Sequence, residues 1–488
     1  MKHIFFLVFL AFYTSLFSQV NLVETHIPNN LKGNQILPIE NEKTNQLGVF
    51  SLLSQRSVCY LYDENLVLKD SVQTAEIPSK YKSLLGAQVG KNGTYQLFLS
   101  SKGQQSVLGV APRIKYGFAK FDFSTKKTSW NELELDLKKE YVIESFNLNS
   151  RFVLMTINAK SSVLNFYRFD DNGISEKIVV DCSDILFRDW DGSKVLLSKL
   201  LITKTSLGNS YLEHLVRVNL ETQNSIRLTV NSNKLYLEKG RLLISLDINK
   251  NFTQILSIDT ADWSKKLMGF VKPTVMSSAT GYSTKSNSLI YDGKYFGIKL
   301  FGNKLKLEVT DFNTKEAIKT YLIENNKPIS LKNSPIIIKD GQFVKHREVE
   351  KTSQFFKKLR DGNIALSITK DKNENYEITV GASIPIQYVT TTNSTFSNTH
   401  FPVHSNGLNP VHFSYTGFIG GRTVYIKCLV DKNFDNLDGN IRANVFEKIR
   451  KFVDQENVNY KTVFKFDDKV VLCFYDDSNK VFFQSFEK

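Results

Sequence analysis

Apolar and polar side chains alternate with a period of two residues along most of this chain, which is the pattern of half-buried strands. The clearest stretch is Tyr116–Leu135, where the alternation runs to Phe123, stops at a polar turn, Ser124–Lys127, and resumes at Asn131–Leu135. Weaker strand–turn–strand units of the same kind recur along the sequence. The recurrence predicts a repeating all-β fold, and we expect a β-propeller.

The spacing of the strand ends supports this architecture. Strands of the form apolar-x-apolar end in an acid or amide at five positions, separated by 48, 49, 40 and 52 residues: Asp122, Asp170, Asn219, Asp259 and Asp311. Four-stranded propeller blades repeat about every 40–50 residues. At three of the five ends a threonine follows three positions later, a pattern that favours a tight turn. We expect an all-β, β-propeller-like domain of about seven blades, a count that leaves eight open.

Strand patterns also occur near both ends of the chain. Val20–Ile27 alternates near the N-terminus, and a hairpin pattern covers Val471–Phe486. Because closure removes exposed sheet edges, we expect the N-terminal strand to complete the final blade. No Pro/Ser-rich linker divides the sequence, so residues 19–488 are interpreted as a single domain.

The stretch Ala119–Trp130, AKFDFSTKKTSW, resembles the blade motif of quinoprotein-type propellers, which reads Asp-x-x-Thr-Gly followed by Trp. Asp122, Thr125 and Trp130 match the motif, and Lys126 stands where it has glycine. The match covers one hairpin well and the other repeats poorly. The resemblance implies the propeller fold alone, and we expect no cofactor.

The strand pattern is interrupted between Tyr376–Ala382 and Thr423–Val430. The intervening 384–421 segment is rich in Thr, Asn, Ser and aromatic residues, and it predicts a long loop insertion. Loops of this length are often functional, and aromatic rings among small polar residues suit protein or sugar recognition. An alternative is that the rings fold back over the core. The candidate binding residues are Tyr388, Phe396, His400, Phe401, His404, His412, Phe413, Tyr415 and Phe418.

The strand pattern is interrupted a second time at residues 441–454, which predict one helix inserted near the C-terminus. Asn440 is a suitable N-cap. The apolar residues of the segment recur at helical spacing, and Glu447 and Lys451 form a pair four positions apart on the polar face. We expect the apolar stripe to pack on a sheet.

The N-terminus predicts a signal peptide at residues 1–18. A short basic head is followed by the apolar run Ile4–Tyr13, which is too short to span a bilayer, and the expected cut lies between Ser18 and Gln19. No cysteine lies near the cut, so we expect no lipid anchor, and no later apolar run reaches the length of a transmembrane segment. These features predict a secreted, periplasmic or cell-surface protein.

The positive charge of the chain does not indicate a nucleic-acid partner. The formal net charge is +14, but lysines and arginines are dispersed along the sequence, with no run longer than a pair. A nucleic-acid footprint would concentrate them on one element, so we expect no nucleic-acid partner. A weak attraction to anionic polysaccharide or lipid is compatible with export.

The four cysteines, Cys59, Cys182, Cys428 and Cys473, are too far apart for C-x-x-C motifs. Three of them lie in apolar strand patterns, which predicts buried free thiols. A disulfide between Cys59 and Cys473 is the alternative.

No motif with established chemistry is present. Pro402 lies between His400 and His404 and opposes a helical metal pair, and the segment has no acidic residue to complete a zinc site. The stretch Asp431–Gly439 departs from the calcium-binding EF-hand pattern at its sixth and twelfth positions, so a solvated turn is expected. Paired carboxylates such as Asp170 and Asp171 lie in turns. We therefore name no catalytic and no metal-binding residue.

Taken together, these observations predict an exported, monomeric, non-catalytic propeller that binds a protein or glycan partner at the cell envelope. The competing hypothesis is a carbohydrate-active or quinone-type propeller enzyme, whose catalytic residues would converge from several blades.

Overall fold

The structure is a computed structural model of the chain, and it describes residues 22–26, 35–52, 56–74, 76–101, 114–137, 139–204, 210–212, 215–274, 284–340, 346–384, 409–456, 458–475 and 480–487. The chain divides into two compact units. Unit 1 comprises the described residues of Met1–Ile77, Phe121–Thr128 and Ala443–Lys488, and unit 2 comprises those of Pro78–Lys120 and Ser129–Arg442.

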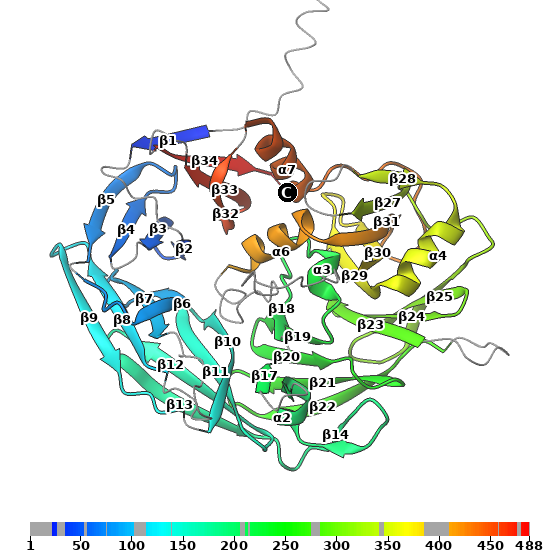
Figure 1. Cartoon of the computed structure of the whole chain (residues 1–488), viewed down its shortest axis with the longest axis horizontal. Coiled ribbons are helices and arrows are strands. Elements are labelled where there is room, and N and C mark those ends of the chain that lie inside the picture. The colour runs from blue at the N-terminus through cyan, green and yellow to red at the C-terminus, as the bar shows by residue number, and fades with distance from the viewer. Residues whose placement is uncertain are drawn as a thin grey trace, which may run out of the picture. The chain divides into compact units, whose positions relative to one another are not determined.

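Unit 1 contains two four-stranded antiparallel sheets. The first follows the chain: β2 (Gln35–Asn41), β3 (Gln46–Leu52), β4 (Ser57–Tyr62) and β5 (Leu68–Gln73). The second has the order β1 (Leu22–His26), β34 (Lys480–Phe486), β33 (Lys469–Tyr475) and β32 (Asn459–Phe466). Strand β1 pairs antiparallel with β34, from Leu22 opposite Gln484 to His26 opposite Lys480 (Figure 1). This confirms that the N-terminal strand completes the last sheet.

Unit 2 begins with two more antiparallel four-stranded sheets in chain order, apart from residues Phe121–Thr128 of the first sheet, which belong to unit 1. Their strands are β6 (Tyr81–Val89), β7 (Tyr95–Ser101), β8 (Tyr116–Asp122) and β9 (Lys127–Leu133), then β10 (Glu140–Leu148), β11 (Arg151–Asn158), β12 (Val163–Asp170) and β13 (Gly173–Asp181). Short elements follow: β14 (Phe187–Arg188), β15 (Lys194–Val195), α2 (Leu197–Leu201), β16 (Ile202–Lys204) and β17 (Ser210–Leu212).

The rest of unit 2 forms three further sheets. In chain order the elements are β18 (Leu215–Arg217), α3 (Ile226–Thr229), β19 (Asn233–Glu238), β20 (Arg241–Leu246), β21 (Phe252–Asp259), β22 (Lys265–Val271), β23 (Thr284–Tyr291), β24 (Lys294–Phe301), β25 (Lys304–Asp311), β26 (Ala317–Glu324), β27 (Ile336–Asp340), β28 (Arg347–Val349), α4 (Thr352–Asp361), β29 (Asn363–Lys370), β30 (Tyr376–Ile384), α6 (Pro410–Ile419) and β31 (Arg422–Val430). The sheets are β18 to β22, β23 to β26, and β28-β27-β31-β30-β29.

Within the described residues there are thus seven sheets of four or five strands. Five of them contain four consecutive antiparallel strands, and a sixth completes such a set with β1. Four antiparallel strands are the repeating unit of a β-propeller blade. The chain is therefore all-β with a β-propeller fold of about seven blades, as the sequence predicted. The core of each unit consists of the inward side chains of these strands, for example Tyr62, Val471 and Phe483 in unit 1.

The repeated turn predicted from the sequence is present. In five sheets an aspartate lies at the end of the next-to-last strand or just after it, and its carboxylate accepts hydrogen bonds from backbone N–H groups of the turn: Asp63, Asp122, Asp170, Asp259 and Asp311. Hydrogen bonds within the turn lower the pKa of Asp122 to about 2, and the bond from the Ser124 hydroxyl has the largest effect. Asn219 is the exception, because it precedes α3 and does not connect two antiparallel strands.

The backbone of these turns has the same conformation at Lys126, which stands where the quinoprotein-type motif has glycine, and at Lys315. Lys126 and Lys315, each four residues after the aspartate, have φ angles of 58° and 65°. This left-handed conformation is the one that glycine adopts at least cost. The turn geometry is thus retained although the preferred residue is absent.

The helix expected at 441–454 is α7, with bounds Val445–Glu456. Its N-cap is Asn444 and not Asn440: the Asn444 side chain accepts a hydrogen bond from the Glu447 N–H (2.9 Å), and the Glu447 carboxylate accepts one from the Asn444 N–H (2.9 Å). This reciprocal capping box fixes the start of the helix. The described residues contain four further short helices that the sequence analysis did not predict.

All four cysteines are buried and free. This confirms the prediction of buried thiols, and no disulfide joins Cys59 to Cys473. Burial raises the pKa of the Cys428 and Cys473 thiols, which keeps them protonated and unreactive.

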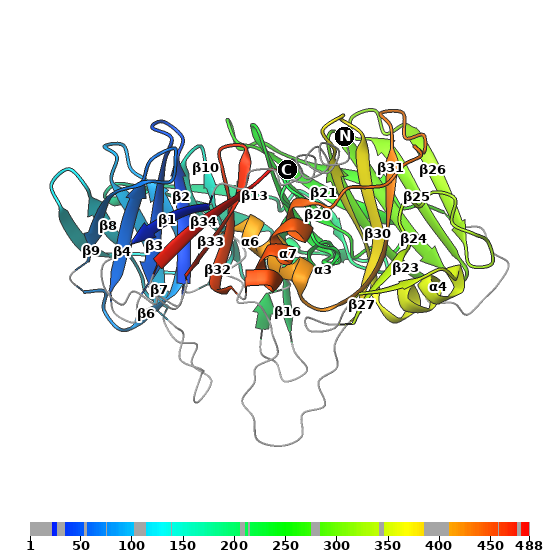
Figure 2. The same ribbon diagram turned by 90° about the horizontal axis from the view of Figure 1, so that it is seen from above.

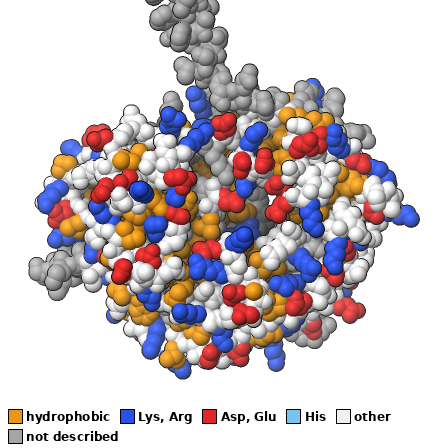
Figure 3. Space-filling model, turned by 180° about the vertical axis from the view of Figure 1, so that it is seen from behind, with side chains coloured by type: hydrophobic (Ala, Val, Ile, Leu, Met, Phe, Trp, Pro, Cys, Tyr) orange, Lys and Arg blue, Asp and Glu red, His pale blue; other side chains and the backbone are white. Residues whose placement is uncertain are grey.

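Charged side chains are mixed on the surface. In the face shown in Figure 3, Lys and Arg lie among Asp and Glu, as the dispersal along the sequence predicts. Among the helices of the described residues, none has both the length and the apolar character needed to cross a membrane.

Candidate functional site

The sheet β28-β27-β31-β30-β29 of unit 2 has two chemically different faces. Successive side chains of a strand point to opposite faces, and residues 423–430 of β31 have the sequence TVYIKCLV. One set of its side chains packs in the core of the unit: Val424, Ile426, Cys428 and Val430. The other set therefore belongs to the opposite face of the sheet.

That opposite face is polar. Its β31 residues are Thr423, Tyr425, Lys427 and, at the end, the apolar Leu429. Cross-strand pairing places Thr379 of β30 opposite Lys427 and Lys339 of β27 opposite Thr423. Two lysines, two threonines and a tyrosine thus share one surface, and all five are buried. Burial of this many polar groups requires a covering layer with partners for them.

Helices α3 and α6 supply the covering layer. They contact each other, and α3 contacts β29 and β30; Figures 1 and 2 both show α3 and α6 side by side next to this sheet. Ile226 of α3 forms a small apolar cluster with Ala365 and Tyr425. This cluster anchors α3 over the polar face.

The turn before α3 is fixed by amide side chains. The Asn219 side chain accepts hydrogen bonds from the N–H groups of Glu221 (2.8 Å) and Thr222 (3.1 Å), and Asn224 donates to the Asn219 carbonyl (2.7 Å). Ser225 caps α3 by accepting from the Leu228 N–H (3.2 Å). These bonds hold the segment between Thr222 and Ser225 in one conformation.

Helix α6 begins after the N-cap residue Asn409, and it contacts α3 at Gly417. The Asn409 side chain accepts from the His412 N–H (3.0 Å), and Pro410 occupies the first helical position, where proline is favoured. A Cβ atom at Gly417 would lie 2.3 Å from Ser225 Oγ. A larger residue here would displace the Ser225 hydroxyl, which caps α3.

A pocket remains between the two helices and the sheet. Its cavity volume is about 20 Å³, and a water-sized group needs about 10–15 Å³. The pocket thus admits one small chemical group. The described residues that line it are Gln223, Asn224, Ser225, Ile226, Lys339, Thr379, Gly417, Phe418, Thr423, Tyr425 and Lys427.

Two ammonium groups belong to this pocket. Lys339 is 4% exposed and Lys427 is 8% exposed. The Nζ atom of Lys339 lies 3.7 Å from the centre of the Phe418 ring and 5.4 Å from that of Tyr425, and it donates a hydrogen bond to the Phe418 carbonyl (3.4 Å). Aromatic faces stabilise a cation when it is removed from water.

One wall of the pocket carries an unsatisfied acceptor. Gln223 is 7% exposed, and its amide group donates to the Thr379 hydroxyl (3.4 Å), but its Oε1 atom has no hydrogen-bond partner within the described residues. A buried acceptor without a donor costs free energy. A donor from a ligand or an ordered water would satisfy it.

Part of the predicted binding segment lies on α6. His412, Phe413, Tyr415 and Phe418 lie on α6, so the final part of the expected loop is helical, and β30 extends to Ile384. Only Phe418 of the four lines the pocket. The other candidates lie outside the described residues: Tyr388, Phe396, His400, Phe401 and His404.

The remaining sequence candidates have structural roles. The Asp431 carboxylate accepts hydrogen bonds from the N–H groups of Asn433 (2.9 Å) and Asp435 (2.8 Å), which confirms a turn. Asp170 accepts from the Asn172 N–H (2.8 Å) in the same way. Within the part of the chain that the structure describes, no group of three His, Cys, Asp or Glu side chains is placed to hold a metal ion.

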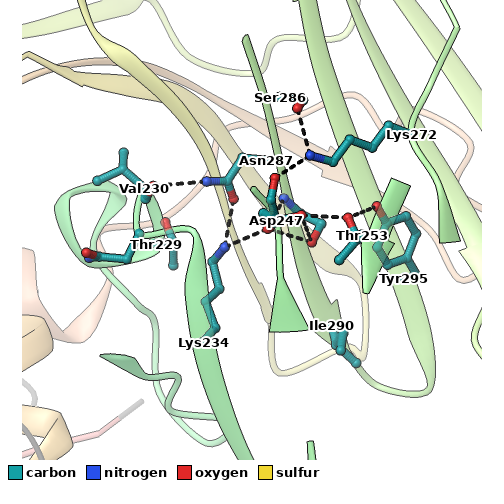
Figure 4. A network of polar contacts seen from close by, with 12 residues as sticks. Thr229, Val230, Lys234, Asp247, Thr253, Lys272, Ser286, Asn287, Ile290 and Tyr295 are labelled. Atoms are coloured by element: carbon teal, nitrogen blue, oxygen red, sulfur yellow. Dashed lines mark hydrogen bonds and ion pairs between the residues drawn. The ribbon is translucent and has the colours of Figure 1, made fainter. Parts of the chain in front are cut away.

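Sequence reasoning missed a buried charged network in unit 2 (Figure 4). Lys234 Nζ lies 3.0 Å from an Asp247 carboxylate oxygen and 3.0 Å from the Asn287 side-chain oxygen, and Lys272 donates to the carbonyls of Asp247 and Asn249. Burial alone would raise the pKa of Asp247, but the charges of Lys234 and Lys272, together with hydrogen bonds from Thr253 and Lys234, outweigh burial and lower it. The network joins the sheet β18 to β22 to β23, and its groups bind one another.

A buried carboxyl group was missed as well. Glu144 of β10 is 2% exposed; one of its oxygens accepts the Ser145 N–H (2.9 Å), and Oε2 has no hydrogen-bond partner in the described residues. Burial raises its pKa to about 7, with a partial offset from the charge of Arg217. No sequence motif marks this position.

Comparison with known proteins gives structural neighbours only. No protein-family model and no curated protein sequence matches the chain. Among solved structures, the Dos1 propeller aligns over 94% of each chain at 10% identity with a TM-score of 0.31. The Cps50 (Swd1) β-propeller domain of Myceliophteria thermophila aligns over 96% of this chain and 99% of that chain at 7% identity, with a TM-score of 0.26.

A europium-containing methanol dehydrogenase aligns over 77% of this chain and 67% of that chain, at 9% identity and a TM-score of 0.28. The first two neighbours are propellers by name. Their identities and TM-scores are too low to carry functional information to this chain.

Proposed function

We propose that the protein is an exported, non-catalytic propeller that binds a protein or glycan partner at the cell envelope, and that α6 with the adjoining pocket forms part of the binding surface. The observation that supports this proposal is the lining of the pocket. It combines ammonium groups, amides, hydroxyls and aromatic rings in one concave site, which is the composition of sites that recognise polar ligands.

The proposal also agrees with the construction of the site. The sheet forms without α6, because β30 and β31 pair directly along their whole lengths, from Tyr376 opposite Val430 to Ile384 opposite Arg422. The segment that connects these two strands is therefore free to serve recognition. Export is proposed from the N-terminal pattern alone.

Capture of partners from the cell-envelope fraction tests the proposal. The bait proteins are the wild type, Phe418→Ala at the pocket, and Leu322→Ala as a control on β26, where the side chain is 53% exposed. We expect the wild type and Leu322→Ala to retain the same partner and Phe418→Ala to lose it, with equal melting temperatures for all three. Retention of the partner by Phe418→Ala would exclude this surface.

A further inference from the structure

The hairpin of β14 and β15 in unit 2 has an inner and an outer face. Phe187 of β14 is opposite Val195 of β15, and both pack in the core of the unit. Leu186 and Leu196 flank this pair and are 49% and 47% exposed. Because successive side chains of an extended backbone point in opposite directions, the two leucines belong to the outer face.

Trp190 lies in the turn of the same hairpin and is 60% exposed. The chain has three tryptophans. The other two, Trp130 and Trp263, are partly buried, and each packs on a neighbouring aromatic ring. A single exposed apolar residue is ordinary on a protein surface, but an indole and two leucines on one short hairpin indicate an interaction surface.

The conformation of the hairpin is fixed by β21 and by the turn that precedes it. The Gln254 side chain accepts a hydrogen bond from the Arg188 N–H (2.7 Å) and donates one to the Arg188 carbonyl (2.8 Å). The Lys250 N–H donates to the Trp190 carbonyl (3.2 Å). The indole is therefore presented by an ordered backbone, and binding through it costs little conformational entropy.

The charged groups around the hairpin are mostly basic. Arg188 is opposite Lys194, next to the outward leucines, and the Lys250 Nζ atom lies 5.8 Å from the centre of the Trp190 ring. In the described part of the chain, neither Lys194 nor Lys250 has an ion-pair partner. This excess of positive charge favours an anionic partner. The basic residues are Arg188, Lys194, Lys199, Lys250 and Lys265, and the acidic residues are Asp191, Asp184, which pairs with Lys265, and Asp189, which pairs with Lys199.

This combination of side chains suits the headgroup region of an anionic bilayer. Tryptophan places its apolar ring beside lipid chains and its N–H beside headgroups. Leucines add apolar burial, and lysine and arginine contact lipid phosphates. A flat surface can reach the hairpin, because β14 lies at the lower edge of the ribbon in Figure 1, beyond β22.

We infer that the β14–β15 hairpin docks the protein onto an anionic lipid surface. Trp190, Leu186 and Leu196 enter the headgroup region, and the basic side chains beside them contact lipid phosphates. The formal net charge of +14 adds a long-range attraction to the same surface. This inference goes beyond the proposed function, because the hairpin shares no residue with the pocket beside α6.

Co-sedimentation with vesicles tests the inference. The probe is a vesicle of phosphatidylglycerol and phosphatidylcholine in equal parts, and the reference is a vesicle of phosphatidylcholine alone. We expect binding to the anionic vesicle to be at least about 10-fold tighter, because each basic side chain near such a surface contributes a factor of about 5. The affinity should fall as the salt concentration rises. Equal affinity for the two vesicles, or no binding to either, would overturn the inference.

Tryptophan fluorescence reports on the hairpin directly. On binding of the wild type to the anionic vesicle, the emission should shift to shorter wavelength as the Trp190 indole leaves water. The Trp190→Phe variant retains an apolar ring, so it should still sediment with the vesicle but lose the shift. A shift that persists in Trp190→Phe would contradict insertion of this residue.

Substitutions at exposed positions locate the contact. We expect Trp190→Ala to weaken vesicle binding by about 10-fold through the loss of apolar burial, and Lys194→Gln to weaken it by about 5-fold. Lys239→Gln is the matched control, because Lys239 is exposed in the β19–β20 turn, at the other end of β20 from Lys250. It makes the same change in net charge and should bind like the wild type. Equal losses in Lys194→Gln and Lys239→Gln would show that net charge alone governs binding and would overturn the assignment of the hairpin.

A protein partner is the alternative occupant of the hairpin. If the wild type binds neither vesicle and Trp190→Ala loses a protein that the wild type captures from the envelope fraction, the hairpin recognises a protein and the lipid inference fails. The proposed function is tested separately by Phe418→Ala, so either idea can fail without the other.

Discussion

The ammonium group of Lys234 lies 3.0 Å from the carboxylate of Asp247, and the two side chains are 0% and 1% exposed. A second ammonium group, that of Lys272, donates to the Asp247 carbonyl, so two buried cations surround one buried anion. Burial lowers the pKa of Lys234 and the charge of Asp247 partly opposes that effect. The negative charge of the Asp247 carboxylate therefore lowers the free-energy cost of burying the two lysines.

Replacement of Asp247 by Ala should destabilise unit 2 strongly. Removal of one partner from a buried ion pair leaves an uncompensated charge and costs about 3–5 kcal/mol. The measurement is the free energy of unfolding in urea. Asp435→Ala is the control, because Asp435 pairs with Lys319 at the surface and such pairs contribute about 0–1 kcal/mol. Equal effects of the two substitutions would show that the buried network does not stabilise the fold.

Glu144 should make the stability of the protein depend on pH near neutrality. Its pKa is raised from 4.5 to about 7 in the folded chain, so the folded state holds a proton that the unfolded state releases. The contribution of Glu144 to stability is then greatest below pH 4.5, falls as the pH rises, and is constant above about pH 7. We expect Glu144→Gln to remove this dependence and to stabilise the protein at pH 8 by up to about 3 kcal/mol.

Urea unfolding at pH 5 and at pH 8 measures the effect. Glu176→Gln is the matched control, because Glu176 is an exposed partner of Arg168. A stability difference between pH 5 and pH 8 that is the same in the wild type and in Glu144→Gln would contradict the assignment.

The left-handed turn residues offer a stabilising substitution. Lys315 has a φ angle of 65° and an exposed side chain, so Lys315→Gly should relieve backbone strain and stabilise the protein by about 0.5–1 kcal/mol. Ala317→Gly, two residues later at the start of β26, should instead cost about 0.5–1 kcal/mol, because glycine in a strand loses more entropy on folding. Thermal unfolding of both variants checks the opposite signs.

Strand β34 should be essential to unit 1. Phe483 is fully buried, with its ring centre 4.8 Å from that of Tyr62, and Phe483→Ala should cost about 3–5 kcal/mol. Phe482 points to the other face of the strand, is partly exposed and stacks on Phe474 at 5.1 Å, so Phe482→Ala should cost distinctly less. Chemical unfolding that ranks the two substitutions in the reverse order would contradict the register of β34.

Some unpredicted elements had signals in the sequence. Helix α4 buries Thr352, Phe355, Phe356 and Leu359, and this spacing is that of one helical face. Helix α6 begins with Asn409 and Pro410, a cap followed by a favoured first residue. Its apolar residues, however, surround the helix, and no periodic contrast marks it.

The sequence by itself determined the strands, their faces and their turns. Alternation in TVYIKCLV separates a core face from a polar face, and Asp311 forms the turn that its spacing to Thr314 predicts, because these features depend on neighbouring residues. The tertiary structure alone decided which polar groups meet. Lys234 alternates like an exposed strand lysine, and only folding brings it to Asp247, 13 residues away, and to Asn287, 53 residues away. In the same way the pocket combines Gln223, Lys339 and Phe418 from distant elements. Such contacts depend on the packing of separate sheets and helices, which no local pattern encodes.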